Sequence, residues 1–323
     1  TTDQGSLTYD KAFTITINDV NENPEDITLS LSLVDENVAI GSLVGLLSAT
    51  DPDAGNTFTF SLVAGAGDTD NASFSINGNE LLIEVSPDFE TKSSYSVRVS
   101  VEDQGLLTFE KELAITISDV NEAPTDISLS AVTIDENVAA STVVGAFSTT
   151  DPDAGEAFTY ALVSGEGDTD NAAFTIVGND LQINSSPDFE AKSSYSIRVQ
   201  SADMGSLTVE KAITINVNNV NEEPSAISLT GNSVNENVAE NSVIGTLATT
   251  DPDAGDTFTY TLVAGDGDTD NASFNIDGAT LRITGSPDFE AKNSYSVRVR
   301  ATDAGGLWVE ETFTVSITNI NES

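Results

Sequence analysis

The chain has 323 residues and a formal net charge of −42, from 53 acidic and 11 basic residues. Nucleic acids and anionic membrane surfaces are bound by basic surfaces, so this charge excludes both as the main partner. The sequence contains no cysteine and no histidine, and no apolar run approaches the roughly 18 residues of a membrane-spanning helix.

A short polar segment that ends in proline recurs every 100 residues, as Asp19–Pro24, Asp119–Pro124 and Asn219–Pro224, and in part as Asn319–Ser323. Internal similarity at a fixed period indicates repeated domains. The sequence therefore predicts three repeats, over residues 25–124, 125–224 and 225–323. Residues 1–24 match the ends of these repeats and are interpreted as the last strand and linker of a preceding, truncated repeat. Because the chain begins without methionine or a signal segment, we expect it to be part of a longer array.

The first predicted element is a strand over residues 6–18, where Phe13, Ile15 and Ile17 alternate with threonines. An apolar strand without a partner is prone to aggregation. We expect this strand either to fray or to pair with a neighbouring molecule.

Each repeat then follows one course of short alternating segments separated by turns rich in glycine, proline, aspartate and asparagine. In the first repeat the alternating segments lie at residues 27–31, 58–62, 74–83, 95–101 and 113–117. About seven short strands at 8–12-residue spacing, without helical periodicity, are typical of a two-sheet sandwich. The sequence predicts an all-β chain of immunoglobulin-like antiparallel Greek-key sandwiches in a linear array.

Several acidic motifs occupy the same loops in every repeat. In the first repeat these are Glu36-Asn37, Asp51-Pro52-Asp53-Ala54-Gly55, Pro87-Asp88-Phe89-Glu90, Tyr95 to Gly105, and the linker Asp119 to Pro124. The set resembles the cadherin repeat over essentially the whole chain. The resemblance implies cadherin-type sandwiches with three calcium ions at each junction between consecutive domains.

Carried over position by position, the resemblance implies a ligand set for each junction. The first full junction takes Glu36, Asp88, Glu90, Asp119, Asn121, Glu122, the backbone carbonyl of Ala123, Asp151, Asp153 and Asp203. The second takes Glu136, Asp188, Glu190, Asn219, Asn221, Glu222, Asp251, Asp253 and Asp303. Only the downstream half is present at the first linker, with Asp19, Asn21, Glu22, Asp51, Asp53 and Asp103. Only the upstream half is present at the last linker, with Glu236, Asp288, Glu290, Asn319, Asn321 and Glu322.

The residue types support calcium independently, because Ca²⁺ takes six to eight oxygen ligands and softer metals prefer histidine and cysteine. Two positions depart from the family pattern. The usual aspartate-asparagine pair of the linker is Glu122-Ala123, and Asn219 stands where the first junction has Asp119. One carboxylate fewer predicts weaker calcium binding at the second junction.

Two further features leave alternatives open. The loop at residues 67–71, which recurs at 167–171 and 267–271, is interpreted either as an Asx-type loop or as an additional calcium site. Trp308 lies on the polar phase of its strand, which predicts either an incidental surface aromatic or a contact with a sugar or a neighbouring domain.

The predicted function is that of a calcium-stiffened extender array in a large secreted or cell-surface protein, similar to the repeats of giant bacterial adhesins. The alternatives are a module that binds polysaccharide or another copy of itself, and a structural subunit of a surface layer or filament. An enzyme is not expected, because no histidine is present and the pair Asp88 and Glu90 recurs in every repeat without a cleft-forming loop.

Overall fold

The computed structural model describes residues 1–322, and each of the three repeats contains eight strands. The first repeat contains β1 (Asp26–Leu29), β2 (Leu33–Asp35), β3 (Ser42–Thr50), β4 (Thr59–Leu62), β5 (Phe74–Asn77), β6 (Glu80–Ile83), β7 (Ser94–Glu102) and β8 (Thr108–Ser118). The second contains β9 (Asp126–Leu129), β10 (Thr133–Asp135), β11 (Val143–Thr150), β12 (Thr159–Leu162), β13 (Phe174–Val177), β14 (Asp180–Ile183), β15 (Ser194–Ala202) and β16 (Thr208–Asn218). The third contains β17 (Ala226–Thr230), β18 (Ser233–Asn235), β19 (Ser242–Thr250), β20 (Thr259–Leu262), β21 (Phe274–Asp277), β22 (Thr280–Ile283), β23 (Ser294–Thr302) and β24 (Trp308–Thr318).

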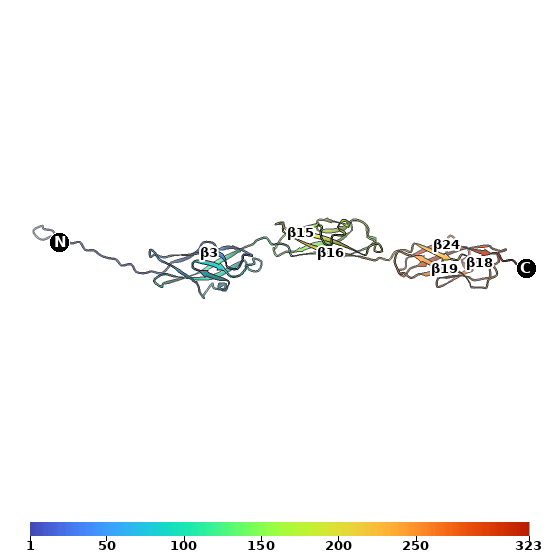
Figure 1. Cartoon of the computed structure of the whole chain (residues 1–323), viewed down its shortest axis with the longest axis horizontal. Helices are drawn as coiled ribbons and strands as arrows, with labels where there is room; N and C mark the ends of the chain where they lie inside the picture. The colour runs from blue at the N-terminus through green and yellow to red at the C-terminus, as the bar shows by residue number, and fades with distance from the viewer. Residues whose placement is uncertain (323) are drawn as a thin grey trace. The chain divides into compact units, whose positions relative to one another are not determined.

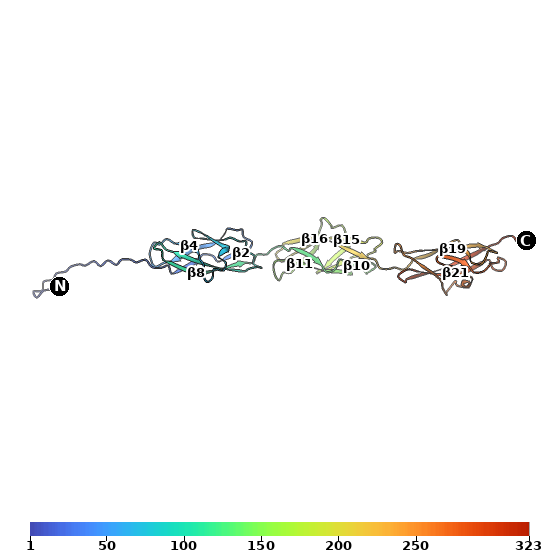
Figure 2. The same cartoon turned by 90° about the horizontal axis from the view of Figure 1, so that it is seen from below.

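Each repeat is a sandwich of two four-stranded sheets, which confirms the predicted fold class (Figures 1 and 2). In the first repeat one sheet has the order β1-β3-β6-β5 and the other the order β2-β8-β7-β4. The alternation of the sequence places one face of every strand inside the sandwich. Along β8, for example, Leu113, Ile115 and Ile117 are buried and the residues between them are exposed.

The start of each repeat differs from the prediction, because the alternating segment at residues 27–31 does not continue as one strand. Strand β1 pairs antiparallel with β3, whereas β2 pairs in parallel with β8 in the other sheet. The chain crosses between the two sheets at residues 30–32. Leu31 therefore does not point into the core as Ile27 does, and it is 64% exposed. The sandwich is therefore not wholly antiparallel.

Three separate hydrophobic clusters fill the sandwiches, one in each predicted repeat. They centre on equivalent aliphatic residues such as Leu81, Leu181 and Leu281, each with no exposed surface. An edge-to-face aromatic pair lies beside each cluster, as Phe74 and Tyr95 do in the first repeat. Because each repeat has its own core, the polar loops at the sandwich ends are left for other roles.

The predicted strand over residues 6–18 does not form in the structure. Apart from one isolated bridge between Thr2 and Thr8, the chain has no sheet pairing before β1. Phe13, Ile15 and Ile17 are 79%, 86% and 91% exposed, and Figure 1 draws this segment without a strand arrow. The reason is the lack of neighbours: the equivalent strand β8 pairs with both β2 and β7.

The chain divides into two compact units. One contains Thr1–Ala123 together with Asp151–Glu156, and the other contains Pro124–Thr150 and the residues from Ala157 onward. The loop at 151–156, between β11 and β12, thus groups with residues 1–123 rather than with the rest of the second repeat. Within residues 1–322, no helix is long and apolar enough to cross a membrane.

Candidate metal centres at the repeat linkers

A buried glutamate holds each of the linkers that begin at residues 119, 219 and 319. Glu36, directly after β2, is 3% exposed, and its two carboxylate oxygens accept hydrogen bonds from the backbone N–H groups of Val120 and Phe89, each at 2.8 Å. Its own N–H donates to the carbonyl of Ser118 at the end of β8. One carboxylate therefore joins the linker to the Pro87–Glu90 loop. Glu136 and Glu236 make the same pairs of bonds, to Val220 with Phe189 and to Ile320 with Phe289.

The linker at 119–124 brings four carboxylates together. Glu36, Glu90, Asp119 and Asp153 each have an oxygen within 4.8 Å of the others. Burial raises the pKa of Glu90, and the charges of Glu36, Asp119 and Asp153 raise it further. Burial and the neighbouring Asp153 likewise raise the pKa of Asp119. The raised pKa values of Glu90 and Asp119 thus follow first from burial and then from the crowding of carboxylates.

The corresponding groups in the other repeats differ in composition. The second repeat contributes Glu136, Asp188 and Glu190, and the third Glu236, Glu290 and Glu322. Asp88, the equivalent of Asp188 in the first repeat, makes other contacts. It accepts hydrogen bonds from the N–H and hydroxyl of Thr91 at 2.8 and 2.9 Å. These bonds lower the pKa of Asp88, which is not a member of the first group.

The asparagines that replace Asp119 act as hydrogen-bond donors. Asn219 donates its side-chain amide to Glu190 at 3.2 Å, and Asn319 donates to Glu290 at 2.9 Å. These two linkers are thus tied to their acidic loops by a neutral side chain.

The downstream half of each site is built around a buried aspartate at the end of the seventh strand. Asp103 is 3% exposed and accepts hydrogen bonds from the Leu107 N–H at 2.9 Å and the Asn21 side chain at 2.8 Å. Burial opposes ionisation of Asp103, but these bonds outweigh it and lower its pKa. Asp53 accepts a bond from the Glu22 N–H at 2.8 Å, and its own N–H donates to Asp51.

The third repeat shows the same arrangement and one ligand candidate that sequence reasoning missed. Asp303 accepts a bond from Asn221 at 3.0 Å, and Asp253 accepts one from the Glu222 N–H at 2.8 Å. Asp251, Asp256 and Asp303 have oxygens within 4.8 Å of one another. Asp256 has a detectable signal in the sequence, because Asn56, Glu156 and Asp256 put an oxygen-bearing side chain after every D-P-D-A-G motif.

The other predicted ligands lie near the linkers but outside these groups. Asp203 is 7% exposed at the end of β15 and accepts a bond from the Leu207 N–H, and Asp151 accepts one from the Asp153 N–H. Asp19 and Ala123 are exposed. The acidic ligands predicted at complete junctions that belong to none of the groups are Asp88, Glu122, Asp151, Asp203, Glu222 and Asp253.

Buried carboxylate oxygens without hydrogen bonds test whether these residues suit a cation. In the described part of the chain they include Asp51 Oδ2, Asp153 Oδ1, Asp251 Oδ2 and Asp256 Oδ2. A buried carboxylate oxygen without a partner is costly, and a bound cation removes that cost. Hard oxygen ligands gathered around several acids fit Ca²⁺ better than any softer metal.

The loop at 67–71 forms by hydrogen bonding of the Asx type. Asp68 accepts a bond from the Gly65 N–H at 3.0 Å, and Asn71 bridges the Val63 carbonyl and the Arg98 N–H. Asp70 forms an ion pair with Lys92 and also accepts the Ser96 N–H. The carboxylate of Asp70 is thus already neutralised, which disfavours an additional calcium site in this loop.

Trp308 points outward, as predicted, and is 44% exposed. Its ring stacks on the guanidinium of Arg300, 4.2 Å from the ring centroid. Arg300 in turn pairs with Glu310. The aromatic surface is therefore partly covered by a neighbour on its own sheet.

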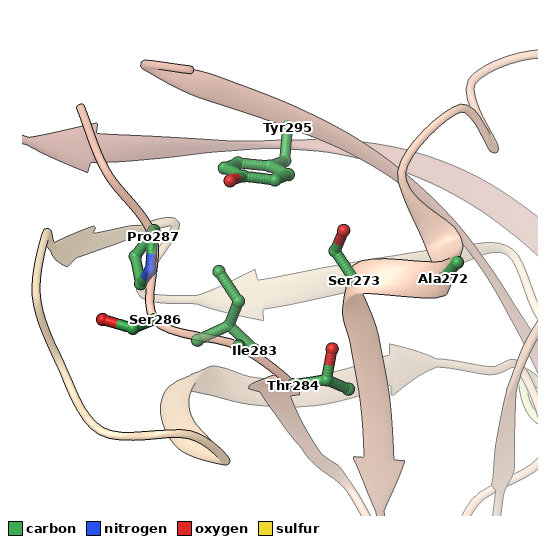
Figure 3. Close-up of a pocket in the computed structure, with 8 residues that line it drawn as sticks. Ala272, Ser273, Ile283, Thr284, Ser286, Pro287 and Tyr295 are labelled. Carbon is green, nitrogen blue, oxygen red and sulfur yellow. The ribbon is translucent and has the colours of Figure 1, made fainter. Parts of the chain in front are cut away.

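A small cavity of about 140 Å³ lies beside Tyr295 in the third repeat (Figure 3). Hydroxyl and apolar groups line it, among them Ser273, Ile283 and Gly285. The first repeat has Val85 at the position of Gly285, and Val85 packs against the hydrophobic core. Gly285 is exposed and supplies no side chain to this cavity, and a Cβ at this position would meet no atom within 4 Å.

Comparisons with known proteins agree with this architecture. Residues 232–318 match the family model of the cadherin domain. The chain is 29% identical over 304 residues to mouse protocadherin Fat 4, and 25% identical over 348 residues to human protocadherin Fat 1. These alignments cover 90% and 100% of the chain but only 6% and 7% of the relatives, so the chain spans a small part of either protein.

Solved structures show the same fold. Extracellular cadherin domains 1–5 of protocadherin gamma B2 match with a TM-score of 0.62 at 24% identity, covering 94% of this chain and 62% of that one. Domains EC22–24 of mouse cadherin-23 match with a TM-score of 0.63 at 22% identity, covering 93% and 100%. The chain therefore has the fold of tandem cadherin domains, and its third repeat matches the cadherin domain family.

Proposed function

We propose that this chain is a calcium-stiffened extender within a large extracellular adhesion protein. The observation that carries the proposal is the set of carboxylate groups around the linkers, together with the buried carboxylate oxygens that lack hydrogen bonds. Calcium at these places removes the repulsion between the acids and joins the linker to the loops on either side. The ligands are those predicted above for each junction, with Asp256 added at the second.

The proposed array works outside the cell and holds a more distant binding domain away from the surface. The affinities expected of extracellular calcium modules, about 10⁻⁴–10⁻³ M, suit calcium levels outside rather than inside cells. The relatives named above are animal proteins, and the extender role does not depend on whether the array stands on a bacterial or an animal cell.

Small-angle X-ray scattering and thermal melting of the full chain, with millimolar calcium and with chelator, test this function. A ligand at free concentration c that binds only the folded state stabilises it by RT ln(1 + c/Kd), which for millimolar calcium at Kd values of about 10⁻⁴–10⁻³ M is about 0.4–1.4 kcal/mol per site. We expect calcium to give a longer, stiffer particle and a higher melting temperature. An unchanged scattering profile and an unchanged melting temperature would together refute the proposal.

A second candidate function is assembly by strand addition, which the exposed segment at residues 6–18 favours. Phe13, Ile15 and Ile17 present an apolar face with no sheet partner in the structure. Such a segment can complete a sheet in another copy of the chain. Analytical ultracentrifugation tests this: concentration-dependent assembly that disappears on deletion of residues 1–20 supports it, and a monomer at all concentrations refutes it.

A further inference from the structure

The linkers at 119–124 and 219–224 share almost all of their anchoring contacts. Val120 and Val220 donate their N–H groups to Glu36 and Glu136, each at 2.8 Å. Glu122 and Glu222 donate theirs to Asp153 and Asp253, at 2.7 and 2.8 Å. The side chains of Asn37 and Asn137 donate to Glu122 and Glu222, at 2.7 and 2.8 Å. Differences between the linkers therefore come from few positions.

The first position of the linker is the main difference. Asp119 adds a carboxylate to the group that contains Glu90 and Asp153. At the same place Asn219 donates its amide to Glu190, at 3.2 Å. An ionised Asp119 is repelled by the neighbouring carboxylates, whereas the amide of Asn219 forms a favourable hydrogen bond with one carboxylate, that of Glu190.

Asn319 shows that this contact is not particular to one linker. It donates to Glu290 at 2.9 Å, which is the equivalent bond one repeat later. Asn219 and Asn319 thus make the same contact in equivalent places. Asp119 cannot donate this hydrogen bond, because an ionised carboxylate is only an acceptor.

We propose that Asn219 takes over part of calcium's role at its linker, so that the linker at 219 stays ordered without calcium and binds the ion more weakly than the linker at 119. This inference rests on the proposed function for the calcium part only, because the order of the calcium-free linker is a property of the protein alone. The order of the linker at 119 then depends strongly on calcium, and the order of the linker at 219 depends on it weakly.

Glutamyl endopeptidase digestion of the full chain in chelator measures linker order directly, because the equivalent residues Glu122 and Glu222 are both cleavable. A Glu223→Ala background makes the linker sequences D-V-N-E-A-P and N-V-N-E-A-P, which differ only at 119 and 219. Fragments are identified by mass. The rate of cleavage at a site that opens locally is proportional to the fraction of molecules in which the site is open. Loss of one hydrogen bond raises that fraction, and hence the cleavage rate, by about fivefold.

In chelator we expect cleavage after Glu122 to be about fivefold faster than after Glu222. Adding Asn219→Asp is expected to remove the difference, and Asp119→Asn to slow cleavage after Glu122. Asn179→Asp adds the same charge in the exposed turn between β13 and β14 of the second repeat and is expected to change neither rate. Equal rates in the background, or no effect of Asn219→Asp, would overturn the proposal.

Trp308 provides a calcium readout for the second junction, because it pairs with Thr302 beside Asp303. An added carboxylate about 5 Å from a divalent ion in water raises affinity by about tenfold. Asn219→Asp is therefore expected to lower the calcium concentration at the midpoint of the Trp308 fluorescence change by about that factor. An unchanged midpoint contradicts the weaker-binding half of the proposal. Absence of calcium binding in a chelator-competition assay refutes the proposed function instead, and leaves the digestion result to decide on the linker.

Discussion

Replacing Glu136 with glutamine tests whether this side chain both anchors the linker and holds the ion. Its oxygens accept the N–H groups of Val220 and Phe189, each at 2.8 Å, and the carboxylate is 3% exposed. Glutamine keeps the shape but offers one acceptor oxygen, so its NH₂ group faces one of the two donors. A buried donor left without an acceptor costs about 1–3 kcal/mol.

Glu136→Gln also removes a negative charge, and in the absence of calcium this loss of charge is stabilising. Glu136 lies within 4.8 Å of Asp188 and Glu190, so neutralising it relieves repulsion and offsets part of the lost hydrogen bond. With calcium bound, the same change removes an attraction instead. We therefore expect the destabilisation by Glu136→Gln to be larger in calcium than in chelator.

Thermal melting of the full chain in calcium and in chelator measures both values. Since 1 kcal/mol shifts the melting temperature of a 100-residue domain by about 4–8 °C, the loss in calcium is expected to be about 5–20 °C for the second repeat. Glu166→Gln, in an exposed loop of the same repeat, is the matched control and is expected to leave the transition unchanged. The reasoning is refuted if Glu136→Gln destabilises equally with and without calcium.

Three further substitutions probe the sandwiches. Burial opposes ionisation of Asp170, but its bonds with Lys192 and the Ser196 N–H lower its pKa below 3.8. Its contribution to stability is therefore fully present above the unfolded pKa and is lost as pH falls through the lower folded pKa. Urea melts should show Asp170→Asn destabilising at neutral pH by an amount that shrinks as the pH is lowered into the acid range, and a difference that stays constant with pH would contradict this. Gly285→Val fills the cavity beside it and should raise the melting temperature of the third repeat, with a gain of about 0.5–2 kcal/mol; a loss would show that the cavity cannot accept the side chain. Gly245→Ala would place its Cβ 2.0 Å from the Thr230 carbonyl oxygen, so urea melts should show a loss of about 1–3 kcal/mol, and no loss would mean that the crossing segment moves freely.

The repeats and the sandwich class could be read from the sequence, because both depend on local patterns. Side chains alternate between the two faces of a strand, so the spacing of Leu113, Ile115 and Ile117 already specifies a buried face. The 100-residue period likewise marks the linkers as equivalent places. The oxygen-rich composition of those linkers indicated the kind of ion that they suit.

Only the tertiary structure decided which of these groups lie together. Asp88 and Asp188 occupy equivalent positions, yet Asp188 belongs to a carboxylate group and Asp88 does not. Asp256 belongs to a carboxylate group only because Asp303, distant in sequence, lies within 4.8 Å of it. The segment at 6–18 has the pattern of a strand but no neighbours to pair with. Alternation and composition are properties of single segments, whereas pairing, charge repulsion and the loss of hydrogen-bond partners arise only between segments that folding brings together.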